Sequence, residues 1–531
     1  MRLKFAIKCS AVSLLFCWCS ATLANEVPPA SDPAVDKVRF DVWEFQVEGA
    51  SLLPHTSVEN VVYPFLGSNK SLVDVEAAKR ALEQAYREAG YAAVLVNIPE
   101  QDASTGVIRL QVVESKIERF RVTGTRYFSP RDLRTEIPAL QPGSPLHLPT
   151  LQGQLTQASA LAPDRVLNPL FRPGLEPGTM EAELKVEDRL PVHGSIGFND
   201  RYTYGSSHLR MDASLMHSNL WQRHHSASLN YQASPQQWDE ARVWVLGYSI
   251  PVDQTRWNFL AVHSASRSAA LGTLGVLGNG DVLGLTWQRQ LPAKSQVKQG
   301  VSLQAQFKDQ SQEVMLPDGN GLSTPIRYTV GQATYNRYQQ DTQGSTSYSV
   351  GTSLGLRLLG NSEEEFRNKR FNAKANFTHL NADVERLQAG FMKSTWRIHL
   401  GAQLSDSPLI SNEQFNAGGA DTVRGYPESQ AMGDDAFLAN LELRSPPLVS
   451  GKQGWMNDLQ LLVFADKAWL KRHDPLPAEK QSQNLAGVGV GARLVAGKNF
   501  NLALDWASPL DDAGSIKRNE ARFHFNLRYE F

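Results

Sequence analysis

The C-terminal two thirds of the chain alternates apolar and polar residues in short segments separated by turn-forming residues. The last segment shows this pattern best. Its apolar positions are Ala521, Phe523, Phe525, Leu527, Tyr529 and Phe531, and its polar positions are Arg522, His524, Asn526, Arg528 and Glu530. A strand between lipid and a wet lumen needs one apolar and one polar face. A strand of a soluble β-sandwich alternates as well, so this segment alone leaves both architectures open.

The same alternation extends over residues 189–531, where helical periodicity is absent. Only a closed barrel satisfies every backbone hydrogen bond within lipid. At about 9–11 residues per strand plus turns, roughly sixteen strands fit this length. The sequence therefore predicts a mainly β fold with a transmembrane antiparallel β-barrel of about 16 strands. We expect long loops at residues 309–325 and 472–483, where polar residues accumulate.

Ahead of the barrel, two stretches show one order of elements: strand, helix, helix, strand, strand. In residues 40–115 the second helix is predicted at 73–89, where apolar residues including Leu82 recur at helical spacing. Residues 116–188 repeat the order and begin with a strand containing Ile117, Phe120 and Val122. Two similar units in tandem indicate an internal repeat, although a single unrelated α+β domain also fits the pattern.

The N-terminus has the features of a secretory signal peptide, which is excluded from the fold. Arg2, Lys4 and Lys8 precede an apolar core, and small residues near Ala24 offer a cleavage site. We therefore expect a signal peptide at 1–24 and a short, proline-containing leader at 25–39. All three cysteines lie within the signal, so the exported part depends on packing and hydrogen bonds rather than on disulfides.

Composition and motifs argue against several other functions. The net charge is −1, whereas nucleic-acid binding requires a basic patch. The G-x-S-x-G pattern at 351–355 lies in a β-rich run without the following helix that a serine hydrolase needs. Gly487, Gly489 and Gly491 would share one strand face, which suggests a small-residue patch beside a packed loop rather than a nucleotide site. We expect no enzyme activity, no catalytic residue, no cofactor and no metal.

Three stretches carry a resemblance to a known family. The first comprises residues 164–174, 176–179 and 184–188; the second is Gly-Gly-Ala-Asp-Thr-Val-Arg-Gly-Tyr at 418–426; the third is Phe-Ala-Asp at 464–466. With the tandem modules, they resemble the two-partner secretion transporters, the TpsB family of FhaC-like and ShlB-like proteins in the superfamily that includes BamA. The resemblance covers essentially the whole exported chain and implies two periplasmic POTRA domains, 40–115 and 116–188, before an outer-membrane barrel at 189–531.

The resemblance also implies a lid. In that family a loop, here near 411–435, folds back into the barrel lumen, and its arginine meets a strand aspartate. The corresponding residues are Val423, Arg424, Gly425, Tyr426, Phe464 and Asp466. Arg424 inside a barrel would need a carboxylate partner, and a guanidinium–carboxylate pair is bidentate and directional. The terminal Phe531 resembles the signal recognised by the barrel-assembly machinery of the outer membrane.

The expected function is capture of an unfolded partner polypeptide in the periplasm and its export through the barrel. The partner would be TpsA-like, with a β-helical fold, and the transporter would contact outer-membrane lipid and no nucleic acid. Haemolysin-type or adhesin-type partners are also activated by some members of the family. Candidate partner-binding residues are Val73, Leu82, Ile117, Phe120 and Val122. An outer-membrane protein insertase and a passive porin remain as alternatives.

Overall fold

The chain divides into two units, one up to Pro191 and one from Val192 onward, close to the boundary predicted after Asp188. The computed structural model describes residues 39–266, 270–271, 276–277, 279–293, 296–315, 321–360, 362–450, 455–477 and 479–531. The predicted signal peptide and almost all of the leader lie outside these residues. None of the helices in the described ranges is long and apolar enough to cross a membrane.

The first module follows the predicted order of elements. Its sheet has the order β2 (Glu44–Glu48), β5 (Val107–Glu114), β4 (Val94–Asn97), with β2 parallel and β4 antiparallel to β5. The helices are α1 (His55–Val62), η2 (Tyr63–Phe65) and α2 (Leu72–Glu88), and the short elements are β1 (Phe40–Val42), β3 (Gly67–Lys70) and η3 (Ala103–Thr105). Ser71 and Asp74 form a capping box that starts α2. Alternate residues of β5, among them Leu110, are buried with the inner face of α2.

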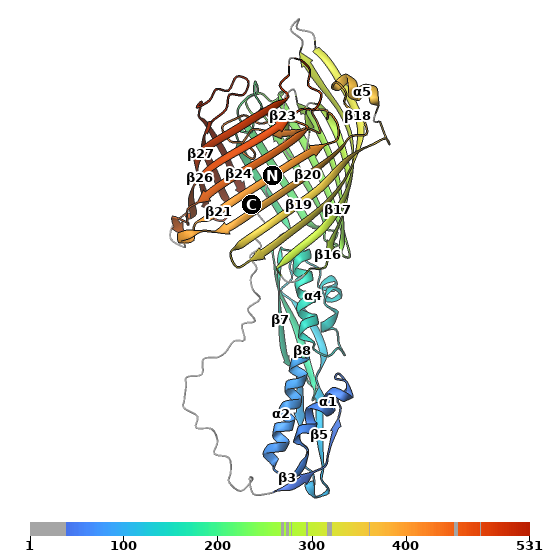
Figure 1. Cartoon of the computed structure of the whole chain (residues 1–531). Coiled ribbons are helices and arrows are strands. Elements are labelled where there is room, and N and C mark those ends of the chain that lie inside the picture. The colour runs from blue at the N-terminus through green and yellow to red at the C-terminus, as the bar shows by residue number, and fades with distance from the viewer. Residues whose placement is uncertain are drawn as a thin grey trace. The chain divides into compact units, whose positions relative to one another are not determined.

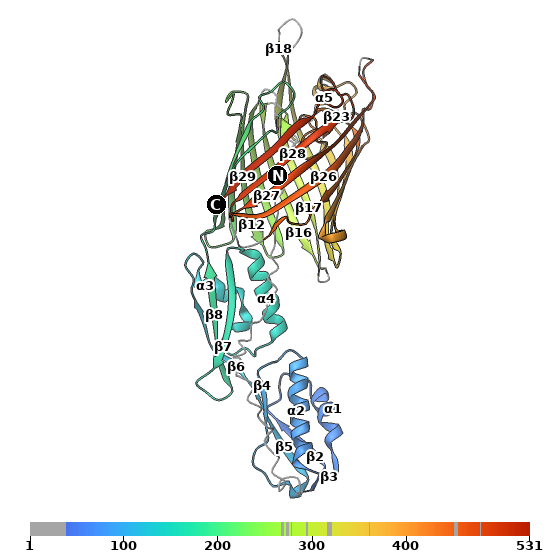
Figure 2. The same cartoon turned by 90° about the vertical axis from the view of Figure 1, so that its left-hand side faces the viewer.

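The second module repeats this arrangement. Its sheet has the order β6 (Lys116–Thr123), β8 (Thr179–Asp188), β7 (Arg165–Pro173), with β6 parallel and β7 antiparallel to β8. The helices are α3 (Pro130–Glu136), η4 (Pro138–Leu140) and α4 (Leu148–Leu161). Figure 2 shows both sheets with their helices on one face. The tandem of two α+β modules is thus present, which excludes the single unrelated domain.

Within the described residues, sixteen antiparallel strands form the wall of a closed barrel, as predicted (Figure 1). They are β9 (Val192–Asn199), β10 (Arg210–Leu220), β11 (His225–Ala233), β12 (Ala241–Val252), β13 (Thr255–Ser266), β16 (Asn279–Leu291), β17 (Val297–Met315), β18 (Gly321–Asp341), β19 (Gly344–Leu356), β20 (Thr378–Ala389), β21 (Thr395–Ser405), β24 (Asp435–Arg444), β26 (Met456–Lys471), β27 (Ser482–Ala496), β28 (Phe500–Pro509) and β29 (Arg522–Glu530). Shorter elements are β14 (Ala270–Leu271), β15 (Val276–Leu277), α5 (Glu363–Lys369), η5 (Phe391–Lys393) and β25 (Val449–Ser450).

The last strand closes the barrel against the first. Asn526 to Glu530 of β29 pair with Asn199 to Ser195 of β9. The backbone N–H and C=O of Phe531 continue the ladder with Gly194, each at 2.9 Å. The side chains of Phe523, Tyr529 and Phe531 are each at least half exposed on the outer face, whereas His524 is 4% exposed. The alternation read from the sequence therefore separates an outer apolar face from a polar lumen face.

One predicted loop is instead a hairpin. Residues 309–315 and 321–325, expected to lie in a long loop, belong to β17 and β18, which pair in register from Val297↔Gln339 to Met315↔Gly321. Polar residues accumulate here because the two strands extend beyond the part of the barrel that faces lipid. The strands remain hydrogen-bonded to each other in this polar region. The second predicted loop is present and runs from Arg472 to Gln481.

A lumenal lid site in the barrel

The segment between β21 and β24, residues 406–434, is folded into the barrel lumen, and we call it the lid. It contains a small hairpin of β22 (Phe415–Ala417) and β23 (Ala431–Gly433). Its residues Val423 and Tyr426 are 0% exposed and pack with lumen-facing Leu438 and Leu485. A loop that packs on lumen-facing side chains occupies the interior of the barrel, as the resemblance implied.

Strand β26 presents Asp466 to this lid. Alternate residues Leu462, Phe464, Asp466, Ala468 and Leu470 are buried, while Leu461, Val463 and Trp469 are exposed on the outer face. The period-2 geometry of the strand therefore fixes the direction of the Asp466 side chain toward the lumen.

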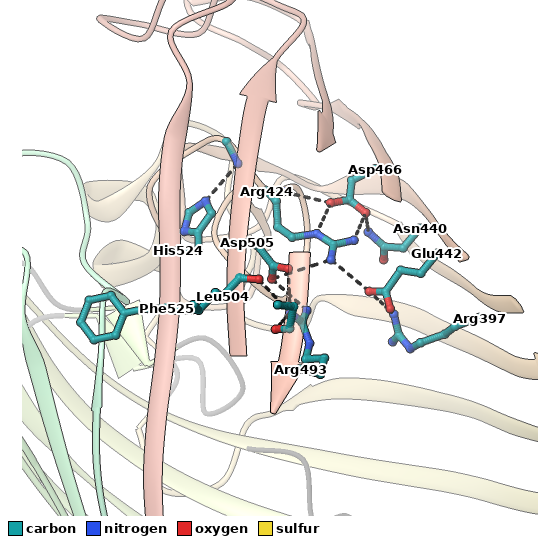
Figure 3. A network of polar contacts seen from close by, with 12 residues as sticks. Arg397, Arg424, Asn440, Glu442, Asp466, Arg493, Leu504, Asp505, His524 and Phe525 are labelled. Carbon is teal, nitrogen blue, oxygen red and sulfur yellow. Dashed lines mark hydrogen bonds and ion pairs between the residues drawn. The ribbon is translucent and has the colours of Figure 1, made fainter. Parts of the chain in front are cut away.

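Arg424 and Asp466 form the predicted pair (Figure 3). The Arg424 Nε donates to Asp466 Oδ2 at 2.7 Å, and Nη2 donates to Oδ1 at 2.8 Å. The backbone N–H of Arg424 also donates to Asp466 Oδ2, at 3.2 Å. The guanidinium carbon lies 3.4 Å from the centroid of the Phe464 ring, a cation–π contact. Arg424 thus contacts both Asp466 and Phe464, with a geometry that lysine cannot reproduce, and we call these three residues the lock.

Two further carboxylates approach Arg424. Its Nη1 lies 3.1 Å from Glu442 and 3.9 Å from Asp505. Glu442 also pairs with Arg397 and Arg444, and Asp505 pairs with Arg493. Figure 3 shows this chain of alternating charges on the lumen wall. Buried charges are costly unless each is paired, so removing Arg424 would leave Asp466 without a cation, whereas Glu442 and Asp505 would keep their other arginines.

The tip of the lid is fixed by backbone contacts. Gly425 has a φ of +98°, which favours glycine, and its N–H donates to His524 Nε2 at 3.0 Å. The other ring nitrogen of His524 lies 2.8 Å from Asp200. The Tyr426 hydroxyl donates to the Asp511 carbonyl oxygen at 2.7 Å. Each residue of the Val423–Tyr426 motif therefore has a separate packing or hydrogen-bonding role.

Of the three glycines of β27, Gly487 lies against the lid, and Gly489 and Gly491 lie against residues of the barrel wall. A Cβ on Gly487 would overlap the carbonyl oxygen of Arg424, and one on Gly489 would meet the Phe464 ring. A Cβ on Gly491 would overlap an Asp505 carboxylate oxygen. The small-residue patch thus admits the lid backbone and its charge network.

A second polar cluster holds the start of the lid. Glu413 accepts hydrogen bonds from Lys308 Nζ and the Tyr328 hydroxyl, both at 2.7 Å, and His379 Nε2 lies 3.7 Å from its carboxylate. Near the lid's end, Arg370 donates to Asp434 Oδ2 at 2.8 Å. The lid is therefore anchored on β17, β18 and β20 as well as on β24, β26 and β29.

Most of the predicted partner-binding side chains are not on the surface. Leu82, Ile117 and Phe120 are 0%, 1% and 7% exposed and belong to the module cores, so their proposal as a binding wall is corrected. Val122 is partly buried against the same core, and Val73 alone is exposed, at 53%. The alternation of apolar residues in β6 and their helical spacing in α2 indicate the faces of these elements that pack into the module cores.

The sequence reasoning did not identify Glu442, Asn440, Asp505 or Glu413 as lid contacts. Asn440 Nδ2 donates to Asp466 Oδ1 at 2.8 Å, and its backbone is directly opposite Asp466 in the β24–β26 register. For Asn440, Glu442 and Asp505 the sequence held a usable signal, because these residues are polar and lie on the lumen-facing side of their strands. Among the described residues, no group of three or more His, Cys, Asp or Glu side chains is arranged to hold a metal ion.

Comparisons with known proteins agree with this architecture. The outer membrane transporter CdiB of Escherichia coli O6:K15:H31 (strain 536 / UPEC) is 23% identical over 525 residues, covering 92% of this chain and 84% of the relative. CdiB of Dickeya dadantii (strain 3937) is 21% identical over 425 residues, covering 77% and 73%.

Solved structures show the same fold. CdiB from Escherichia coli superimposes with a TM-score of 0.64 at 18% identity, covering 95% of this chain and 93% of that one. BamA from Haemophilus ducreyi lacking POTRA domains 1-3 gives a TM-score of 0.58 at 14% identity, covering 93% and 100%.

Family models match both parts of the chain. Residues 40–115 match the POTRA domain, ShlB-type. Residues 178–494, more than half of the chain, match the model of the haemolysin secretion/activation protein ShlB/FhaC/HecB. Together with the lid and its buried arginine lock, this match means that the chain belongs to the ShlB/FhaC/HecB family of haemolysin secretion/activation proteins.

Proposed function

We propose that this protein captures an unfolded partner polypeptide in the periplasm and exports it through its outer-membrane barrel after the lid shifts. The observation that carries the proposal is the lid itself, which fills the lumen and is held there by the buried Arg424–Asp466 pair. A passive porin has no use for such an obstruction. The likeness to BamA is one of fold, and the family match favours secretion over the insertase alternative.

The lock supplies a barrier that can be removed without unfolding the barrel. Its partners on the wall lie on β24, β26 and β28, and Arg424 lies on the lid. When the lid is displaced, Arg424 and its partners on the wall lose their contacts with one another and contact water and the exported chain instead. Export also needs a driving force, which we assign to folding of a β-helical, TpsA-like partner outside the cell. Assembly of the barrel itself would use Phe531 as its signal and surrounding lipid as its solvent.

The test is secretion of the partner from cells that express Arg424→Ala or Asp466→Ala. Arg424→Ala leaves the buried Asp466 without a cation, and Asp466→Ala removes the bidentate partner of Arg424. Because breaking a buried pair costs up to about 3–5 kcal/mol, we expect a displaced lid and at least a severalfold change in secreted partner. Leu283→Ala, on the outer face where that residue is 58% exposed, serves as the control. Unchanged secretion from both lock variants, at normal barrel levels, would remove the lock from the mechanism.

Capture of the partner is assigned to the free edge of β6. An exposed strand edge binds an extended segment through main-chain hydrogen bonds. The start of β6 is covered, since Gly143 N–H donates to the Ile117 carbonyl oxygen at 2.7 Å and Ile117 N–H to that of Ser144 at 2.9 Å. Within the described chain, no backbone hydrogen bond from outside the sheet reaches residues 119–123.

Two other outer edges, β7 and β4, are less suited to pairing. Pro169 and Pro173 interrupt β7, and proline cannot donate to a ladder. On β4 the N–H of Val96 is already bonded to the Glu83 carboxylate at 3.1 Å. These features act as the protection that edge strands commonly have, and they leave β6 more open to an incoming strand than β7 or β4.

Site-specific photo-crosslinking distinguishes the two edges of the second module. A photoreactive residue replaces Arg121 on β6 or Asn168 on β7, both of which are exposed. We expect crosslinks to the partner from position 121 and few from position 168 when export is stalled. Equal yields from the two positions would contradict edge pairing at β6.

A further inference from the structure

A cavity of about 520 Å³ lies beside the lid's attachment points and is separate from the lock. Its wall includes the basic residues Arg367, Lys374, Lys471, Arg472 and His473 and the acids Asp406 and Asp474. Three segments supply this wall: the loop with α5 between β19 and β20, the first residues of the lid, and the loop after β26. Both barrel termini lie at the end joined to the periplasmic modules, so these loops lie at the extracellular end.

The walls of the cavity are held in place. Arg370 donates to Asp434 Oδ2 at 2.8 Å and to the His473 carbonyl oxygen at 3.0 Å. Asn372 Nδ2 donates to Asp474 Oδ2 at 3.2 Å. These bonds join the α5 loop to the end of the lid and to the loop after β26. The basic residues therefore converge on a preformed hollow.

The cavity has an excess of uncompensated positive charge. Within the described residues, the side chains of Arg367, Lys374 and Lys471 form no ion pair and no hydrogen bond. Asp406 accepts from the Thr378 N–H at 2.9 Å and Asp474 accepts from Asn372; both donors are neutral, so the two carboxylates keep their negative charge. Arg472 is 3.3 Å from Glu479. Three cations without an ion-pair partner, set against two carboxylates, leave a positive excess in the lining, which favours an anionic ligand.

The position of the cavity indicates which kind of anion would bind there. Lys471 ends β26 on the parity of Leu461, Val463 and Trp469, which are exposed on the outer face at 51%, 51% and 39%. Lys471 therefore stands directly above an aromatic residue at the lipid boundary, where headgroups begin. A soluble anion would have no reason to favour the outward-facing rim over the lumen mouth.

We propose that this cavity binds a phosphate group on the glycan headgroup of an outer-leaflet lipopolysaccharide. The Arg367 guanidinium can form paired hydrogen bonds to phosphate oxygens, and the two lysines contribute point charges. Because Asp406 and Ser407 begin the lid and also line the cavity, the bound headgroup would stabilise the lid's attachment on the extracellular side. The proposal is independent of export, since the site is complete in the closed barrel.

The test measures binding of purified, phosphorylated lipid A to the full-length protein in lipopolysaccharide-free nanodiscs. The variant combines Arg367→Gln, Lys374→Gln and Lys471→Gln; the matched control combines Lys517→Gln and Arg518→Gln, which are exposed cations in the loop between β28 and β29. Removing three partly exposed charges should weaken lipid A binding about tenfold or more, while the control keeps wild-type affinity. Dephosphorylated lipid A should bind the variant and the wild type equally.

Other outcomes overturn the proposal. Equal lipid A affinity in the triple variant and the wild type would exclude the site. Binding of inorganic phosphate without binding of lipid A would show a free-anion site, and tighter binding of an acidic peptide would assign the cavity to the exported chain. If the triple variant does not insert, Lys374→Gln alone, on an exposed loop residue, should show a smaller loss of the same sign. Failure of this test leaves the secretion assay unaffected.

Discussion

The close approach of the lid to β27 depends on a single missing Cβ. The carbonyl oxygen of Arg424 occupies the space that a side chain at Gly487 would take. The lock arginine is thereby positioned from both ends: its side chain by Asp466 and its backbone by the glycine surface. A small change at Gly487 therefore tests the lid without removing any charge.

Gly487→Ala should displace the lid backbone and weaken lid closure by about 1–3 kcal/mol, the usual cost of overpacking. The expected result is a higher mean ion conductance in planar bilayers, with the thermal unfolding of the barrel little changed. Gly284→Ala is the matched control, because a Cβ there meets Leu260 at 3.4 Å and Gln306 at 3.5 Å, ordinary contact distances. Identical conductance of the two variants would contradict the packing argument.

In the first module, Glu114 at the end of β5 connects three elements. Its carboxylate accepts from the N–H groups of Ser51 and Leu52 at 2.7 and 2.8 Å and from the Tyr86 hydroxyl at 2.9 Å. Burial opposes ionisation of Glu114, but the hydrogen bonds from Ser51, Leu52 and Tyr86 outweigh it and keep its pKa below the usual value. Burial and the nearby carboxylate raise the pKa of Tyr86 well above its usual value.

The lowered pKa of Glu114 predicts an acid-sensitive first module. A carboxyl whose pKa is lower in the folded state stabilises the fold above its unfolded pKa, about 4.3, and loses that contribution as the pH falls through the folded value. Glu114→Gln should cost about 1 kcal/mol at neutral pH, allowing for solvent screening, and flatten the acid limb. Hydrogen exchange of α2 between pH 3 and 7 measures both effects; parallel pH profiles for variant and wild type would contradict this assignment.

Strand alternation allowed the barrel to be predicted because lipid and water impose opposite requirements on adjacent residues. In the two small modules, apolar periodicity led to a wrong prediction of the partner-binding surface. Phe120 lies in an alternating strand pattern and Leu82 in a helical pattern because both side chains belong to a module core. The Arg424–Asp466 pair came from a resemblance, since nothing in strand periodicity shows which lumen residues a loop will meet. Glu442 and Glu413 were missed for that reason: their partners are set by how the lid crosses the lumen.

Two of the contacts that hold the lid in the barrel share no side chain. Arg424 is held by β24, β26 and β28, whereas Glu413 is held by Lys308 of β17 and Tyr328 of β18. A lid released at one place remains attached at the other. Full opening of the lumen therefore requires both sets of contacts to break, and either alone should permit only partial displacement.

Independent anchors predict additive free energies, since distant sites without shared partners usually add to within about 0.3–0.5 kcal/mol. Glu413→Gln and Arg424→Ala should each raise the open probability of the barrel in planar bilayers. The double variant should raise it by about the product of the two separate effects, because the free energies of release sum. A double variant no more open than Arg424→Ala alone would mean that the Glu413 cluster follows the lock passively. Of these two anchors, the contacts of Arg424 alone would then control opening of the lid.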